Sequence, residues 1–268
     1  MHASQIALQL YTLRDRCATA ADLATTIARV RKIGYTAVQI SGVGPIPETE
    51  IVRICRGEGV AICATHEPGK TIVEEPQKVI DRLGALGCRH TAYPHPHIKP
   101  TTLDEALAIA AQLDRAGEAL RKAGMVLTYH NHALEFRKFG GRTWLDILYS
   151  ETDPRNLQGE IDTYWVQTGG GDPVAWCRRL YRRLPLLHLK DYGIDDQNKP
   201  TMMEIGNGVL DWPAIISAAD DAGTEWFIVE QDICPADPFD SITQSLRFLA
   251  QLASERRGTP AAAPVPTR

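Results

Sequence analysis

Side chains that bind metals or carry protons gather in the segment YHNHALEF, at positions 129 to 136. Two histidines, an asparagine and a glutamate follow directly on the apolar run MVLTY. Imidazole and carboxylate groups at this density can hold a metal ion or exchange protons with a substrate. The same types recur in EIDTYW around Asp162, in HLKD around His188 and in VEQD around Glu230.

Short apolar, β-branched runs precede these segments and recur along the whole chain, which is typical of buried parallel strands. The eight runs are 6–13, 36–42, 60–68, 89–96, 125–132, 157–165, 184–193 and 225–232. Between most of them lie stretches with apolar spacing of three and four. Several of these stretches begin with Asp or Thr, or with Pro just inside, and end at Gly, as helices do.

Strict alternation of strands and helices, with no shift in composition midway, predicts one α/β domain with a parallel sheet. Eight such units in about 250 residues match a single (β/α)8 TIM barrel. We assign it residues 1–255 and expect the Pro- and Ala-rich tail 256–268 to be disordered. An open doubly wound sheet is the alternative, but the first strand is followed by YTLRDRCATA, without a glycine-rich turn.

The net charge of -4 and the pI near 6.1 give no electrostatic footprint for nucleic acid. The basic run RRLYRR at 178–183 is interpreted as a solvated helix face without a partner. Six scattered cysteines form no CxxC pair and indicate reduced thiols in a cytoplasmic protein. No apolar stretch approaches eighteen residues and none resembles a secretion signal, so we expect no membrane association.

In a barrel of this kind the carboxyl ends of the strands form the active-site face. Predicted strands five to eight deliver Glu135, Asp162, His188 and Glu230 to that face. Carboxylates with a single histidine suit a divalent ion such as Mn, Mg, Co or Zn, and the lack of a cysteine ligand argues against structural zinc. We therefore predict one divalent metal ion with positions open to substrate oxygens.

Each residue also has a structural interpretation. Asp162 is suited to cap the turn that follows it, and His188 to be a hydrogen-bonded core histidine. Lys190 fits a surface position at a strand exit, and Trp165 fits a packing role. Glu230 follows FIV, where a carboxylate without a partner would be costly. One cation would satisfy Asp162, His188 and Glu230 together, which favours the metal interpretation.

These motifs together resemble the xylose isomerase-like TIM barrel superfamily, in the group of sugar phosphate isomerases/epimerases, over about residues 5 to 252. The motifs are LQLYTLRD, THEP, YHNHALEF, EIDTYW with GGGDPVAW, HLKD, EIGNGVLDW and VEQD. The resemblance implies a divalent metal held by Glu, Asp, His and Glu from strands five to eight. Carried onto this chain, the ligands are Glu135, Asp162, His188 and Glu230, with His132 as the rival of Glu135.

The resemblance also implies a sugar or polyol substrate that loses a proton next to its carbonyl and passes through an ene-diolate. In an isomerase or epimerase, Glu230 and Glu135 would be the catalytic base and acid. The expected substrate-binding residues are Gln9, His66, His130, His132, Trp165 and Lys190.

Three other activities remain open at this point. A lyase or dehydratase acting on a keto-glycoside or an inosose would use the same site. An endonuclease IV-like phosphodiesterase would need more ligands and a basic surface, which the charge of -4 opposes. A non-catalytic sugar-binding barrel would be favoured if Asp162, His188 or Glu230 were replaced, and all three are present. A homo-oligomer is compatible with all of these.

Overall fold

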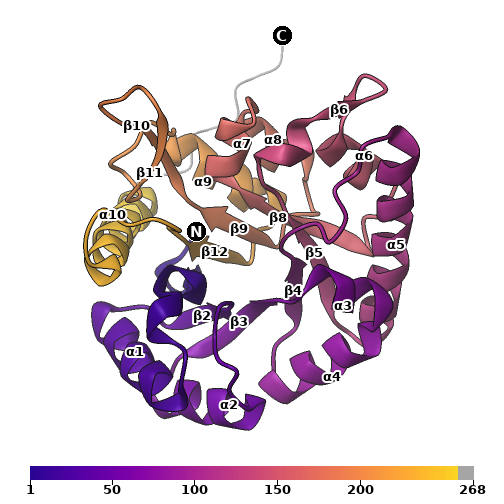
Figure 1. Cartoon of the computed structure of the whole chain (residues 1–268). Helices are drawn as coiled ribbons and strands as arrows, with labels where there is room; N and C mark the ends of the chain where they lie inside the picture. The colour runs from indigo at the N-terminus through magenta and orange to yellow at the C-terminus, as the bar shows by residue number, and fades with distance from the viewer. Residues whose placement is uncertain (259–268) are drawn as a thin grey trace.

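The computed structural model describes residues 1–258, which form a closed parallel barrel ringed by helices (Figure 1). This confirms the predicted TIM barrel. Around the barrel the strand order is β1-β12-β9-β8-β5-β4-β3-β2, so every strand pairs with its sequence neighbours among the eight barrel strands. The strands are β1 (Ile6–Gln9), β2 (Ala37–Ile40), β3 (Ala61–His66), β4 (His90–Tyr93), β5 (Val126–His130), β8 (Leu157–Asp162), β9 (Leu186–Leu189) and β12 (Trp226–Val229).

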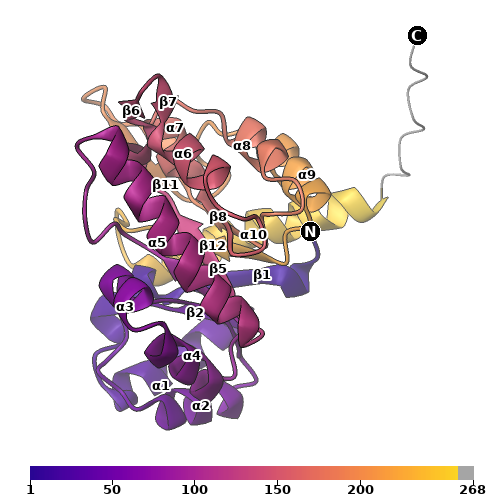
Figure 2. The same cartoon turned by 90° about the vertical axis from the view of Figure 1, so that its right-hand side faces the viewer.

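The helices pack on the outside of the barrel, as the view from the side shows (Figure 2). They are α1 (Ala20–Ile33), α2 (Glu48–Gly57), α3 (Gly69–Glu74), α4 (Pro76–Leu86), α5 (Leu103–Lys122), α6 (Trp144–Ser150), α7 (Thr163–Thr168), α8 (Pro173–Arg179), α9 (Trp212–Ala222) and α10 (Pro238–Gly258). Three 3-10 helices, η1 (Ala3–Gln5), η2 (Leu10–Arg16) and η3 (Ala133–Phe136), complete the helical elements of this part of the chain.

The helix starts follow from local hydrogen bonds. The Thr102 hydroxyl accepts the backbone N–H of Glu105 at 3.2 Å and begins α5, the longest helix after α10. Asp172 and Asp211 cap α8 and α9, each with Pro in the first turn, as the GDP and DWP sequences predict. Several helices end at a glycine with positive φ, such as Gly87 after α4 and Gly223 after α9.

Two apolar layers lie on the two sides of the barrel sheet. The larger one fills the space between strands and helices, and the smaller one includes Ala7, Ala37, Leu186 and Ile228. Because side chains alternate along a strand, the residues two positions further on belong to the same face as this smaller layer. Those residues are Gln9, Gln39, His188 and Glu230. The barrel interior is therefore apolar near the amino ends of its strands and polar near their carboxyl ends.

Some elements were not predicted from the sequence. Hairpins β6 (Lys138–Phe139)/β7 (Arg142–Thr143) and β10 (Asp191–Ile194)/β11 (Pro200–Met203) lie outside the ring of barrel strands (Figure 1), and α6 fills the connection before β8. Helix α10 continues to Gly258, past the predicted boundary at 255. Of the predicted disordered tail, positions 259–268 lie outside the described residues. Within residues 1–258, no helix is both long and apolar enough to cross a bilayer.

Candidate metal centre

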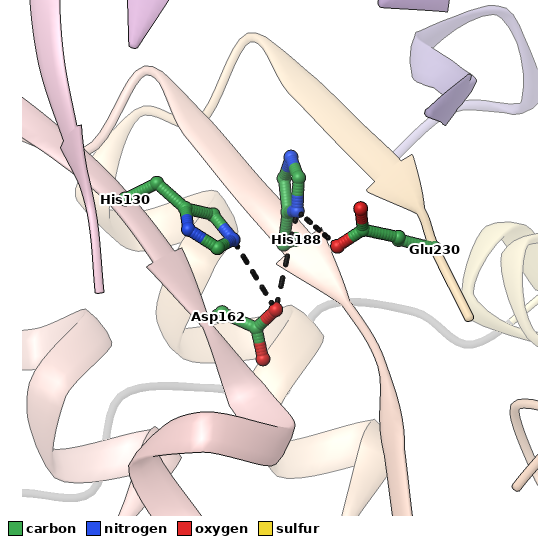
Figure 3. Close-up of side chains that lie close together, drawn as sticks. All are labelled: His130, Asp162, His188 and Glu230. Carbon is green, nitrogen blue, oxygen red and sulfur yellow. Dashed lines mark hydrogen bonds and ion pairs between the residues drawn. The ribbon is translucent and has the colours of Figure 1, made fainter. Parts of the chain in front are cut away.

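Four buried side chains from four neighbouring strands meet at the carboxyl end of the barrel (Figure 3). His130 ends β5, Asp162 ends β8, His188 lies on β9 and Glu230 follows β12. Each offers one nitrogen or oxygen atom, and these atoms all lie within 4.8 Å of one another. His188 Nδ1 is 3.1 Å from Glu230 Oε2 and 4.0 Å from Asp162 Oδ2. His130 Nε2 is 3.4 Å from the same Asp162 oxygen.

The donor set fits a divalent cation. In the described part of the chain, neither ring nitrogen of His130 makes a hydrogen bond, and Asp162 Oδ2 makes no hydrogen bond but an ion pair with Lys190 Nζ at 3.1 Å. Buried polar atoms are nearly always satisfied, so the unpartnered ring nitrogens of His130, one of which faces the Asp162 carboxylate, indicate a missing partner. Two imidazoles and two carboxylates around one point supply the ligand types that Mn, Co, Zn and Mg sites use.

Asp162 caps the turn that follows it, and its second oxygen lies where a metal ligand would be placed. Its Oδ1 accepts the backbone N–H of Trp165 at 3.0 Å and so caps α7. Its Oδ2 faces His130 and His188. The cap fixes the carboxylate in this orientation, because the helix start holds one oxygen and leaves the other free for the cluster.

Lys190 supplies positive charge next to the cluster. Its Nζ lies 2.7 Å from Glu230 Oε2, 3.1 Å from Asp162 Oδ2 and 3.1 Å from Asp232 Oδ2, and the side chain is 1% exposed. Burial alone would lower the pKa of Lys190, but the three carboxylates raise it well above its usual range. An ion bound to Asp162 Oδ2 and Glu230 Oε2 would share these oxygens with the ammonium group.

A second carboxylate, Glu160, supports the cluster from within the barrel. Its Oε1 lies 3.1 Å from His188 Nε2 and 2.5 Å from His66 Nε2. Gln39 donates its amide N–H to Glu160 Oε2 at 2.9 Å, and Gln39 Oε1 lies 2.7 Å from His188 Nε2. Gln9 in turn donates to Gln39 Oε1 at 3.0 Å. The network fixes the ring of His188 so that Nδ1 points toward Asp162 and Glu230.

These contacts also set the charges inside the barrel. Burial alone would raise the pKa of Glu160, but His188 and His66 lower it well below its usual range. Burial alone would lower the pKa of His188, but Glu160 and Glu230 raise it to about 10. Glu160 was not predicted from the sequence as a site residue. The signal was present, since Glu160 lies two residues before Asp162 on one strand and therefore on the same face.

Glu135 lies apart from the four residues that meet. Its Oε1 accepts the Tyr129 hydroxyl at 2.9 Å, and its Oε2 accepts the backbone N–H of His132 at 2.8 Å. Burial raises the pKa of Glu135 to about 7. Tyr129 is the neighbour of His130 on β5 and points to the opposite face of the strand. The structure therefore does not bring Glu135 together with Asp162, His188 and Glu230. The Glu135 carboxylate instead forms hydrogen bonds at the start of η3.

His132, the predicted rival of Glu135, also lies outside the four-residue group. Its ring centroid is 5.0 Å from that of His130 and 5.4 Å from that of His95, so the three rings form one wall. Burial lowers the pKa of His132 to about 2, and the ring is neutral at physiological pH. The residue that β5 brings to the cluster is His130, which the sequence analysis expected to bind substrate.

A cavity of about 390 Å³ opens above the cluster. Four of the predicted substrate-binding residues line it: His66, His130, His132 and Lys190. Gln9 is fully buried below it, in the glutamine network. Trp165 stands behind the lining, with its ring 5.3 Å from that of His132. The lining also includes Tyr11, Arg14, Ser41, Pro94, His95, Glu230, Asp232 and Ile233.

The model of the xylose isomerase-like TIM barrel family matches residues 27–252. The chain belongs to this family. The predicted family is thereby confirmed, and the polar cavity at the carboxyl end of the barrel lies where barrels of this kind bind their substrates.

Two proteins that are similar to this chain carry the names of enzymes. An inosose dehydratase from Lacticaseibacillus casei is 29% identical over 173 residues, which is 58% of this chain and 56% of the relative. The chain thus spans about half the length of the curated relatives it matches. A crystal structure of a sugar phosphate isomerase/epimerase from Parabacteroides distasonis is 25% identical, has a TM-score of 0.80 and covers 95% of both chains.

A more distant structure shares the fold. It is a xylose isomerase-like TIM barrel protein from Mycobacterium smegmatis in complex with magnesium, 14% identical, with a TM-score of 0.74. The alignment covers 95% of this chain and 99% of that protein.

Proposed function

We propose that the chain is a metal-dependent enzyme that removes the proton next to the carbonyl of a keto-polyol or keto-sugar and then expels a β-hydroxyl group as water. The observation that carries the proposal is the group of His130, Asp162, His188 and Glu230, of which His130 and Glu230 line a polar cavity. These four residues would hold one divalent ion. When bound, the ion would supply Lewis-acid polarisation of the substrate carbonyl.

The chain's own residues supply the proton chemistry. Glu230 faces the cavity with a carboxylate that accepts the proton from carbon. The Lys190 ammonium, 2.7 Å from Glu230, stabilises negative charge that develops on the carbonyl oxygen. The electron pair of the broken C–H bond then forms the new C=C bond as the C–O bond to the β-hydroxyl breaks, and the proton held by Glu230 passes to the leaving hydroxyl to give water. His132 and His66 line the opposite wall of the cavity and bind substrate hydroxyls there.

The position of Glu135 favours a dehydratase over an epimerase. An epimerase returns a proton to the opposite face of the same carbon, and the predicted donor for that step was Glu135. The carboxylate of Glu135 does not line the cavity, and both its oxygens are hydrogen-bonded elsewhere. The resemblance to inosose dehydratase supports the same choice. Isomerase or epimerase activity is the second candidate, supported by the Parabacteroides structure with its 25% identity.

The experiment that tests the proposal is metal analysis of the purified protein, combined with incubation in D2O with inososes, keto-glycosides and ketoses. We expect a bound divalent metal, and an inosose or keto-sugar product that has lost one water. Deuterium incorporation with inversion and no loss of water would identify an epimerase instead. A protein without metal and without any exchange would overturn both assignments.

His130→Ala is expected to lower the affinity for the divalent metal by about a hundredfold or more, because it removes one of four ligands. Glu135→Gln is the matched control on the same segment. It is expected to leave metal affinity unchanged, since the Gln oxygen can still accept the His132 N–H and its NH2 group can donate to the Tyr129 hydroxyl oxygen. Titration of metal-free protein with Mn measures both. If Glu135→Gln lost metal affinity and His130→Ala did not, Glu135 would be the ligand, as predicted from the sequence.

A further inference from the structure

A second cavity, of about 760 Å³, lies at the other end of the barrel and is larger than the one above the metal centre. Its lining is built from the amino ends of strands and the segments that lead into them: Arg89 precedes β4, Val126 begins β5, Gln158 is the second residue of β8, and Arg183 comes shortly before β9. The proposed reaction takes place at the carboxyl ends of these strands and does not involve this cavity.

Arginines dominate the lining of this cavity. It contains no Asp, Glu or Lys, although the chain as a whole carries a net charge of -4. Part of the set is the run RRLYRR, which the sequence analysis interpreted as a solvated helix face. Helix α8 ends at Arg179, within this run, and the rest forms the turn toward β9. The six arginines are Arg89, Arg121, Arg155, Arg179, Arg182 and Arg183.

Arg183 places a charge in the wall that no direct ion pair within residues 1–256 compensates, although Asp153 and Asp114 act on it at longer range. Its guanidinium donates to the carbonyl oxygens of Leu157 at 2.8 Å and Tyr149 at 2.6 Å, and to the Thr152 hydroxyl at 2.7 Å. Among residues 1–256, no carboxylate lies within ion-pair distance of it. Burial lowers the pKa of Arg183, because water solvates the charge less well there. The carbonyls fix the side chain in place but do not neutralise its charge.

Two more guanidinium groups make no direct ion pair with a described carboxylate; Arg89 acts on Glu225 only at longer range, where it adds to the lowering of the Glu225 pKa by His90. Arg121, Arg155 and Arg179 each pair with a carboxylate outside the lining, whereas Arg89 and Arg182 make no side-chain hydrogen bond or ion pair with the described residues. The carboxylate of Glu225, in the adjoining hollow, pairs with His90 at 3.5 Å.

The backbone of Arg182 is fixed in place. It has a φ of 58°, and its N–H donates to the Ala222 carbonyl at 2.9 Å. This contact connects the arginine-bearing turn to the end of α9. Three guanidinium groups, those of Arg89, Arg182 and Arg183, therefore present positive charge to one hollow from segments that are already ordered.

We propose that this hollow, the arginine cavity, binds a small organic anion with two or more phosphate or carboxylate groups. Guanidinium groups recognise such oxyanions through paired N–H donors. Free arginines on two separate segments favour a ligand with more than one anionic group. The volume of about 760 Å³ is in the range of small-molecule sites, far larger than one inorganic ion needs. The site is independent of the proposed reaction at the opposite end of the barrel.

The experiment is calorimetric titration of the metal-loaded protein with 2,3-bisphosphoglycerate, with glycerol 3-phosphate as the singly phosphorylated comparison. We expect saturable binding of the bisphosphate that weakens as KCl is added, and weaker binding of the monophosphate. Arg89→Gln/Arg182→Gln is expected to lower the affinity about a hundredfold, about tenfold for each guanidinium removed. Both side chains are exposed and unpaired, so the double variant should fold normally, which its thermal unfolding curve checks.

Two controls locate the binding. Arg53→Gln removes an exposed arginine on α2 that pairs with Glu50 at 2.7 Å, and is expected to leave the affinity unchanged. Glu230→Gln changes the opposite cavity and should also leave it unchanged. Three results would overturn the proposal. The first is the absence of saturable binding, and the second is equal affinity for the bisphosphate and the monophosphate. The third is loss of affinity in Glu230→Gln but not in the double arginine variant.

Discussion

Glu230→Gln is expected to reduce solvent proton exchange into the substrate by about a thousandfold or more, within the range that a general base contributes. The substitution keeps the size of the side chain and one oxygen near His188, but it removes the basic carboxylate. It also removes the negative partner that Lys190 Nζ contacts at 2.7 Å. The measurement is the rate of deuterium incorporation at saturating metal, with bound metal determined in the same sample.

Glu225→Gln is the matched control for this substitution. Glu225 directly precedes β12 at the opposite end of the strand from Glu230, and its carboxylate is half exposed beside His90. The Glu225→Gln variant should exchange solvent deuterium into the substrate at the rate of the unmodified protein. A Glu230→Gln variant that carries full metal and exchanges at the normal rate would exclude Glu230 as the base.

Glu160→Gln is expected to weaken metal binding by about 10- to 100-fold although Glu160 is not proposed as a ligand. The carboxylate lies 3.1 Å from His188 Nε2 and 2.5 Å from His66 Nε2, and it is fully buried. Without it, the ring of His188 loses the contact that helps orient Nδ1 toward the centre. We also expect the metal-free protein to lose about 3 kcal/mol in free energy of unfolding, as when one partner of a buried ion pair is removed.

A purely structural role for Glu160 would change stability alone, so the decisive measurement is the metal dissociation constant of folded protein. Glu204→Gln provides the comparison. Glu204 is a buried glutamate that accepts the Ser241 hydroxyl at 2.8 Å, away from the centre. It should lower stability without changing metal affinity. Equal metal affinity in Glu160→Gln and the unmodified protein would show that Glu160 does not position His188.

The sequence predicted the barrel well because the signals for it are local. Each strand is a short apolar run, and each helix start or end depends on residues within a few positions, such as Thr102 with Glu105. Asp162, His188 and Glu230 could be placed at one face for the same reason. Each follows directly on an apolar run or lies within one, and parallel strands present their carboxyl ends together.

The contribution of β5 depended on the tertiary structure. His130 and His132 share a strand face by alternation, and Glu135 lies three residues further on, so spacing alone did not choose among them. The strand ends at His130, and the turn η3 then directs Glu135 to the Tyr129 hydroxyl on the opposite face. Whether His130 or Glu135 reaches the centre thus depends on the hydrogen bond between Tyr129 and Glu135, which forms only in the folded chain.

The (β/α)8 architecture, the family and three of the four residues that meet at the proposed centre could be predicted from the sequence. Only the tertiary structure brought His130 to that centre, placed Glu160 between His66 and His188, and gathered six arginines around a cavity at the opposite end. The physical reason is separation along the chain. Periodicity and capping act over a few residues, whereas these groups come from segments far apart in sequence, and closure of the barrel sets the distances between them.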